Sequence, residues 1–81
     1  MPDDRPTPAQ IRALLAHLLA GAAGGTEAEW SKRLGEIEIL PIWLHPRCTW
    51  RVTPTGTKKQ REAIDAAVAI VAEAHPYVRP G

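Results

Sequence analysis

The sequence predicts a small α+β domain in the order helix, helix, β-hairpin, helix. Two observations support this fold class. Three segments place Thr at an N-cap position with Gln or Glu three residues later, and one short stretch alternates apolar and polar residues as a half-buried strand does. A chain of 81 residues has room for one domain, which buries about 60–65% of its unfolded surface. The sequence leaves one alternative open, an all-α three-helix bundle with an irregular 38–54 segment.

Three helices are predicted from these capping boxes and from the apolar periodicity that follows each of them. The boxes are Thr7-Pro8-Ala9-Gln10, Thr26-Glu27-Ala28-Glu29 and Thr57-Lys58-Lys59-Gln60, and the predicted helices cover about 8–22, 27–37 and 58–75. In the first helix Ala13, Ala16 and Ala20 line the side that faces away from the leucine stripe. A lone surface helix normally carries charged residues there, so the Ala-rich side is a candidate contact surface.

The segment after the second helix is predicted to form a hairpin, with strands at about 38–44 and 48–53. Pro41 disfavours a helical conformation in the residue before it. Pro46 cannot supply the positive φ that a two-residue hairpin loop requires, so a four-residue loop over 45–48 is favoured.

This register places Trp43 opposite Trp50. Because the chain has no Phe, its three Trp residues are predicted to anchor one core. The predicted core members are Trp30, Trp43, Trp50, Leu14, Leu18, Ile64, Val68 and Val71, with Cys48 and Val52 buried beside Trp50 in the second strand. The compact domain is predicted to span 7–78, with 1–6 and 79–81 as disordered tails.

No catalytic residue, metal site or cofactor site is predicted, and the chain is expected not to be an enzyme. The best local metal-ligand pair is His45 and Cys48, whereas a site needs several convergent ligands. Cys48 is the single cysteine, which excludes an intramolecular disulfide and favours a reducing cytoplasm. The segment 54–59 offers a Gly, hydroxyls and two Lys at a helix N-terminus but lacks the pattern of a nucleotide-binding loop.

Membrane insertion is not expected either. The stretch 14–23 resembles the apolar core of a signal peptide, but residues 1–5 carry two Asp and one Arg instead of a basic run, and His17 interrupts the stretch. No window approaches the ~18–20 apolar residues that a membrane span needs. As a whole the chain looks like a small bacterial protein. This impression does not indicate any particular function.

The function that the sequence favours is protein interaction, because the predicted hairpin has more apolar surface than so short a chain can cover. Leu40, Ile42 and Leu44 fall on its second face, beside Arg51. We therefore expect a non-enzymatic interaction module that binds a protein partner, or itself as a homodimer at tens of micromolar, through these four residues.

Nucleic-acid binding is the alternative function. No acidic residue lies between Glu38 and Glu62, and basic residues follow one another in that interval. They are Arg47, Arg51, Lys58, Lys59 and Arg61. Basic groups interleaved with Trp43 and Trp50 suit phosphate contacts and base stacking. This alternative ranks second because the core is expected to use the same indoles and the net charge is only +1.

Overall fold

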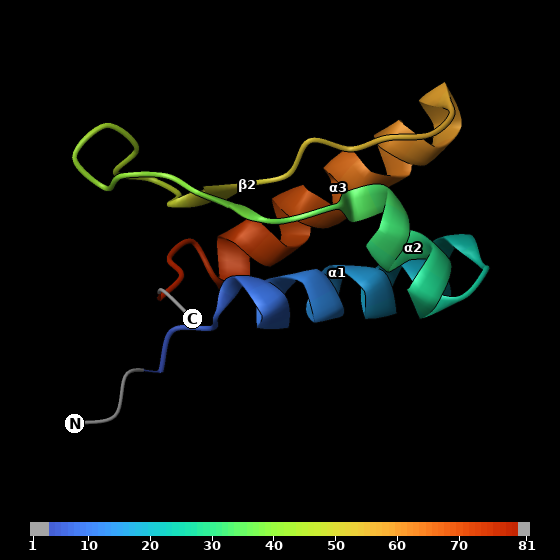
Figure 1. The fold of residues 1–81 in the computed structure, drawn as a ribbon, viewed down its shortest axis with the longest axis horizontal. Helices are drawn as coiled ribbons and strands as arrows, with labels where there is room; N and C mark the ends of the chain where they lie inside the picture. The colour runs from blue at the N-terminus through green and yellow to red at the C-terminus, as the bar shows by residue number, and fades with distance from the viewer. Residues whose placement is uncertain (1–3, 80–81) are drawn as a thin grey trace.

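The computed structural model describes residues 4–79 (Figure 1). Within them the chain forms α1 (Pro8–Ala23), α2 (Glu27–Leu34), β1 (Glu38–Ile39), β2 (Trp50–Arg51) and α3 (Lys58–Ala74). The two strands pair antiparallel. The predicted α+β class and the order helix, helix, hairpin, helix are confirmed. Of the predicted tails, residues 1–3 and 80–81 lie outside the described residues, while the Arg79 N–H donates to the Pro6 carbonyl at 3.0 Å.

Threonine caps begin all three of these helices, as the sequence predicts. Thr7 and Thr57 form complete capping boxes with Gln10 and Gln60, and the hydroxyl of Thr26 accepts from the backbone N–H of Glu29 at 3.2 Å. The first and third helices run almost as predicted.

The second helix is shorter than predicted, because it ends at Leu34 and not near Ile37. Gly35 follows with φ +66°, a conformation that favours glycine and turns the chain out of the helix. Ile37 is nevertheless buried. Its apolar side chain is part of the core although the residue lies in the non-helical segment after α2.

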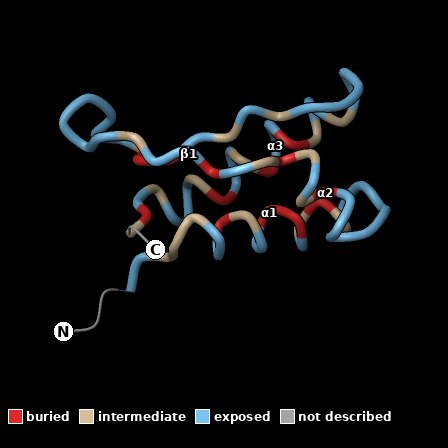
Figure 2. Tube along the Cα trace, viewed as in Figure 1, coloured by how far each residue is buried: buried red, intermediate tan, exposed pale blue. Residues whose placement is uncertain are grey.

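Both other helices pack against α1. In the view of Figure 1, α3 lies between α1 below it and the hairpin above it, and Figure 2 shows the buried positions facing the interior. The core consists of Ile11, Leu15, Ala16, Leu19, Trp30, Leu34, Ile37, Trp50, Ile64, Ala67, Val71 and Val78. Deep burial of these side chains supplies the main stabilising free energy of a domain this small.

The Ala-rich side of α1 is largely used inside the domain. Arg12 donates from Nε and one terminal nitrogen to the Ser31 carbonyl of α2, at 3.1 and 2.8 Å. Ala16, one turn further along the same side, is buried, and Ala20 is half-buried. Small side chains here allow α2 to approach closely, which explains most of a surface that the sequence leaves unexplained; Ala13 alone of the three stays exposed.

Two predicted core residues are wrong. Leu14 is 42% exposed, because the contact with α2 shifts the buried arc of α1 toward Ala16 and away from Leu14. Trp43 is 77% exposed. Trp30, Trp50, Ile64 and Val71 are buried as predicted, whereas Leu18, Val68, Cys48 and Val52 are only half-buried and pack against the edge of the core.

The exposure of Trp43 follows from the hairpin, whose strands are much shorter than the predicted 38–44 and 48–53. Ile39 and not Trp43 lies opposite Trp50. Beyond Ile39 the strand ends, since Pro41 has no N–H to donate and the N–H groups of Leu44 and His45 both turn back to its carbonyl, at 3.1 and 2.9 Å. The chain therefore curls into a turn where the sequence predicts continued pairing.

The C-terminal segment 75–79 is hydrogen-bonded to Thr49 and Trp50, at the end of this connection. Thr49 donates its N–H to the Pro76 carbonyl at 2.8 Å, and its hydroxyl accepts from Val78 at 3.1 Å. The Trp50 indole N–H donates to the His75 carbonyl at 2.7 Å. These bonds fix the hairpin against the end of α3, and they position the surface described next.

Candidate interaction surface

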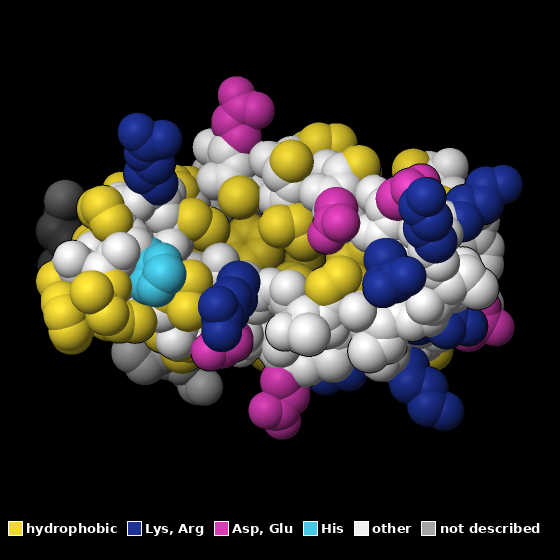
Figure 3. All heavy atoms as spheres, turned by 90° about the horizontal axis from the view of Figure 1, so that it is seen from above, with side chains coloured by type: hydrophobic (Ala, Val, Ile, Leu, Met, Phe, Trp, Pro, Cys, Tyr) yellow, Lys and Arg dark blue, Asp and Glu magenta, His cyan; other side chains and the backbone are white. Residues whose placement is uncertain are grey.

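An uncovered group of apolar side chains follows β1. We call residues 39–46 the apolar loop. Ile42, Trp43 and Leu44 are 57%, 77% and 59% exposed, and Ile39 at the start of the loop is also exposed. In Figure 1 the loop extends past the ends of α1 and α3, and Figure 3 shows hydrophobic side chains gathered at that end of the molecule.

The apolar loop has a fixed shape although nothing covers its tip. Its start is paired, because the Leu40 N–H donates to the Thr49 carbonyl at 2.8 Å. The bonds to the Pro41 carbonyl close its turn, and the Tyr77 hydroxyl donates to the Pro46 carbonyl at 2.8 Å near its far end. A surface held in one conformation loses little entropy when it binds a partner.

A pocket of about 390 Å³ lies beside the tip. Apolar side chains of Leu40, Leu44, Pro46 and Trp50 form most of its wall, together with the half-buried Cys48, and His45 and Arg47 complete it. The Cys48 thiol donates to the Trp50 carbonyl at 3.3 Å. The loop therefore presents a projecting apolar tip and an apolar hollow next to each other.

The one ion pair of the hairpin joins Glu38 of β1 to Arg51 of β2. Two guanidinium nitrogens of Arg51 lie 2.8 and 3.1 Å from the carboxylate oxygens. This hydrogen bonding lowers the pKa of Glu38 and raises the pKa of Arg51. Both side chains are exposed, so the pair fixes the strand register more than it stabilises the fold.

The structure keeps three of the four residues of the predicted interaction site in the apolar loop and places the fourth, Arg51, on β2. Ile42 and Leu44 are exposed in the apolar loop, Leu40 is half-buried at its start, and Arg51 is paired to Glu38 on the hairpin. The predicted reason for their exposure, a second face of a long hairpin, does not apply because the strands end at Ile39 and begin again at Trp50. The sequence reasoning missed Trp43, which it assigned to the core.

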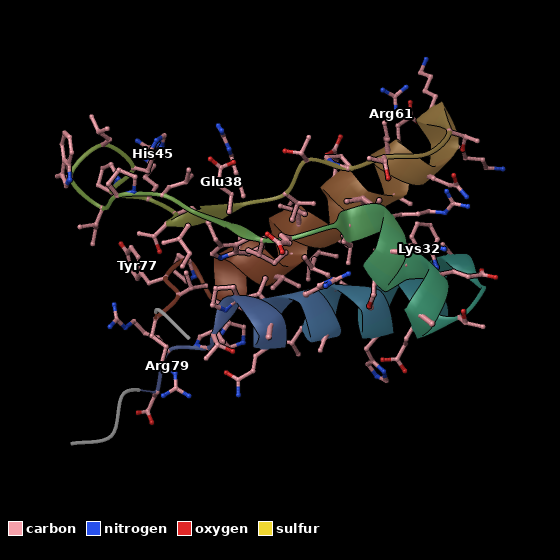
Figure 4. All side chains as sticks on the ribbon, viewed as in Figure 1. Lys32, Glu38, His45, Arg61, Tyr77 and Arg79 are labelled. Carbon is pink, nitrogen blue, oxygen red and sulfur yellow. The ribbon has the colours of Figure 1, made fainter. Side chains whose placement is uncertain are left out.

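The five residues predicted for nucleic-acid binding do not form one patch. Lys58, Lys59 and Arg61 lie in the first turn of α3, whereas Arg47 lies in the connection two residues past His45. Figure 4 places the labelled His45 and Arg61 at opposite ends of a molecule 37 Å long. Arg51 lies between Arg47 and Lys58 in the sequence, and its guanidinium group is already paired with the Glu38 carboxylate.

Another hollow, of about 550 Å³, lies where the start of α3 meets α2 and the end of α1. Trp30, Arg33, Lys59 and Gln60 are among its lining residues. Two of its polar groups already have uses in the fold: the Trp30 indole donates to the Gly24 carbonyl at 2.7 Å, and the Gln60 side chain accepts from the capping residue at 2.9 Å.

Within residues 4–79, no group of three or more His, Cys, Asp and Glu side chains is placed to hold a metal ion. In the same part of the chain, none of the helices combines the length and the apolar character needed to cross a bilayer. Comparison with known proteins gave no significant match to a protein-family model, to a curated protein or to a solved structure. The functional argument therefore depends on the apolar loop.

Proposed function

We propose that this protein is a non-enzymatic interaction module of the reducing cytoplasm, and that the apolar loop is its contact surface for a protein partner or a second copy of the chain. One observation carries the proposal: Trp43 projects, 77% exposed, from a loop that hydrogen bonds hold in one shape. Trp is a residue that contributes strongly to interfaces when it is buried by a partner. Leu40, Ile42, Leu44 and Arg51 belong to the same contact surface.

The size of the patch supports an interaction of moderate strength. Ile39, Ile42, Trp43 and Leu44 together expose on the order of 400–500 Å², taking a full side chain of this size as ~150–250 Å². The largest apolar patches of monomeric proteins measure about 300–600 Å² and are often functional. A stable protein interface needs about 800 Å² on each side, so self-association through this loop alone is weak.

The test is a measurement of molar mass by light scattering over a range of concentrations. We expect the 8.8 kDa chain to approach twice its mass only at tens of micromolar and above. Ile42→Asp should shift the dimer to higher concentration, because it places a charge in the contact, whereas Ile70→Asp on α3, at an equally exposed isoleucine, should not. A mass independent of concentration would eliminate self-association and leave a different protein as the partner.

Nucleic-acid binding stays a second candidate because three cations meet at the start of α3, with Glu62 the first acidic residue after them. We expect weak, salt-dependent binding, with a Kd of about 10⁻⁴–10⁻⁶ M or poorer at physiological salt. Changing Lys58, Lys59 and Arg61 together to Gln should leave the fold intact. Submicromolar, sequence-selective binding of an oligonucleotide, abolished by this triple change, would make nucleic acid the primary partner.

A further inference from the structure

We propose that the apolar loop recognises a linear segment of another protein in which a large apolar side chain is flanked by acidic residues. The apolar side chain enters the pocket beside Trp50, the projecting Trp43 packs against the bound segment next to the pocket, and the carboxylates lie against Arg47 and His45. This inference rests on the proposed interaction function and adds the chemistry of the partner.

The pocket is large enough for a large apolar side chain and is lined mainly by apolar groups. Its volume of about 390 Å³ falls in the lower part of the ~300–1,000 Å³ range of ligand pockets. Leu40, Leu44 and Trp50 make its wall apolar, and the thiol of Cys48 is already hydrogen-bonded to the Trp50 carbonyl. An apolar group is therefore the complement that leaves no polar atom unpaired.

The charges around the pocket select an acidic neighbour. Residues 39–61 contain no acidic side chain, and Glu38, which precedes them, is paired with Arg51. Arg47 and His45 line the pocket and are exposed. Within residues 4–79, Arg47 forms no ion pair with a carboxylate, so a partner's Asp or Glu can supply one.

The same charges make a second copy of the chain the poorer occupant. A two-fold contact through the apolar loop brings like surfaces together, so Arg47 approaches its own counterpart. Like charges in an interface oppose association. Self-association should therefore strengthen as salt screens this repulsion, whereas binding of an acidic segment should weaken.

Two other kinds of partner, a nucleic acid and an anionic membrane, fit the apolar loop less well. Nucleic-acid bases stack on aromatic rings, and Trp43 alone among the exposed apolar side chains of the loop offers one, beside the aliphatic Ile42 and Leu44. An anionic bilayer would accept the projecting tip but makes no use of a side-chain-sized hollow beside it. The combination of tip and pocket favours a polypeptide.

The experiment is selection of a display library of random linear peptides on the folded full-length chain. Three variants are compared with the original: Trp43→Ser, Arg47→Glu and, as a matched control outside the loop, Ile70→Ser. Exposed side chains are changed in each case, and far-UV circular dichroism confirms that each variant is folded. Selected peptides are then measured by fluorescence anisotropy at low and high salt.

We expect enriched peptides with a large apolar residue next to Asp or Glu. Trp43→Ser should weaken their binding at least about tenfold, while Ile70→Ser changes it less than about twofold. Arg47→Glu should weaken it similarly, and repeating the selection on that variant should give basic flanks in place of acidic ones. High salt should weaken binding to the original chain.

Each contrary result points to a different conclusion. Apolar peptides that depend on Trp43 but show no acidic preference would overturn this inference and leave the proposed function standing. No enrichment that depends on Trp43, together with no self-association that depends on Ile42, would refute both. Binding to phosphatidylserine vesicles that Trp43→Ser abolishes, without peptide enrichment, would overturn the inference in favour of a membrane surface.

Discussion

The same substitution at the two tryptophans of the hairpin region should have very different effects on stability. Trp50→Phe removes the indole N–H that donates to the His75 carbonyl, at a side chain only 2% exposed. An unsatisfied carbonyl costs about 1–3 kcal/mol, and the smaller ring leaves a void that costs roughly another 1 kcal/mol. We therefore expect a loss of about 2–4 kcal/mol. Trp43→Phe should change stability by no more than ~0.5 kcal/mol, because Trp43 is exposed and, within residues 4–79, its side chain forms no hydrogen bond.

The loss expected for Trp50→Phe is a large fraction of the total stability of the protein. A chain of 81 residues has a total stability of about 4–12 kcal/mol. Urea unfolding followed by circular dichroism gives the free energy of each variant, and Tm should fall by roughly 10–25 °C for Trp50→Phe. Equal losses for the two variants, or a larger loss for Trp43→Phe, would refute the arrangement in which Trp50 anchors the hairpin and Trp43 projects from it.

Three further predictions test the cap, the ion pair and the thiol. Thr57→Ala should cost about 0.5–2 kcal/mol in urea unfolding because it removes the N-cap of α3, whereas Thr53→Ala should stay within ~0.5 kcal/mol; equal effects would contradict the capping box. The hydrogen bond with Arg51 lowers the pKa of Glu38. The ionised Glu38 carboxylate therefore stabilises the fold at pH values above the usual pKa of a Glu, and this stabilisation disappears as the pH falls through the lowered pKa. The urea midpoints of Glu38→Gln and the original chain should therefore converge on the acid side, and a constant difference from about pH 7 to about pH 3 would argue against the pair. The half-buried Cys48 should react more slowly with a soluble thiol reagent in the folded protein than in urea, and equal rates would remove its packing role.

The helices could be predicted from the sequence because their signals are local. A capping box lies within four residues, and the structure has a threonine cap at each predicted helix start. The apolar spacing that follows gives part of the inner side of α3, with Ile64 and Val71 buried but Ile70 exposed. The end of α2 was predicted less well. Glycine can adopt the positive φ that ends the helix at Gly35, but the sequence does not require that conformation there.

The hairpin and the candidate site could not be predicted fully because they depend on contacts distant in the sequence. A continuous apolar run from Ile39 to Leu44 suits a buried strand as well as an uncovered loop. What decides between them is the C-terminal segment, whose carbonyls at His75 and Pro76 accept from Trp50 and Thr49, about 25 residues earlier. Without that contact Trp43 and Trp50 look equivalent in the sequence. The residues Ile42 and Leu44 were correctly proposed as an exposed surface, but from a strand alternation that the structure does not contain.

The hydrogen bond between Pro6 and Arg79 has a practical consequence for engineering. Because the two backbone groups lie 3.0 Å apart, a short glycine linker can join these positions without disturbing α1 or the C-terminal segment. The chain can then be reopened in the exposed connection at Gly56, ahead of α3. Such a circular permutant would place the segment 75–79 in the interior of the chain and keep the bonds that its carbonyls at His75 and Pro76 accept from Trp50 and Thr49.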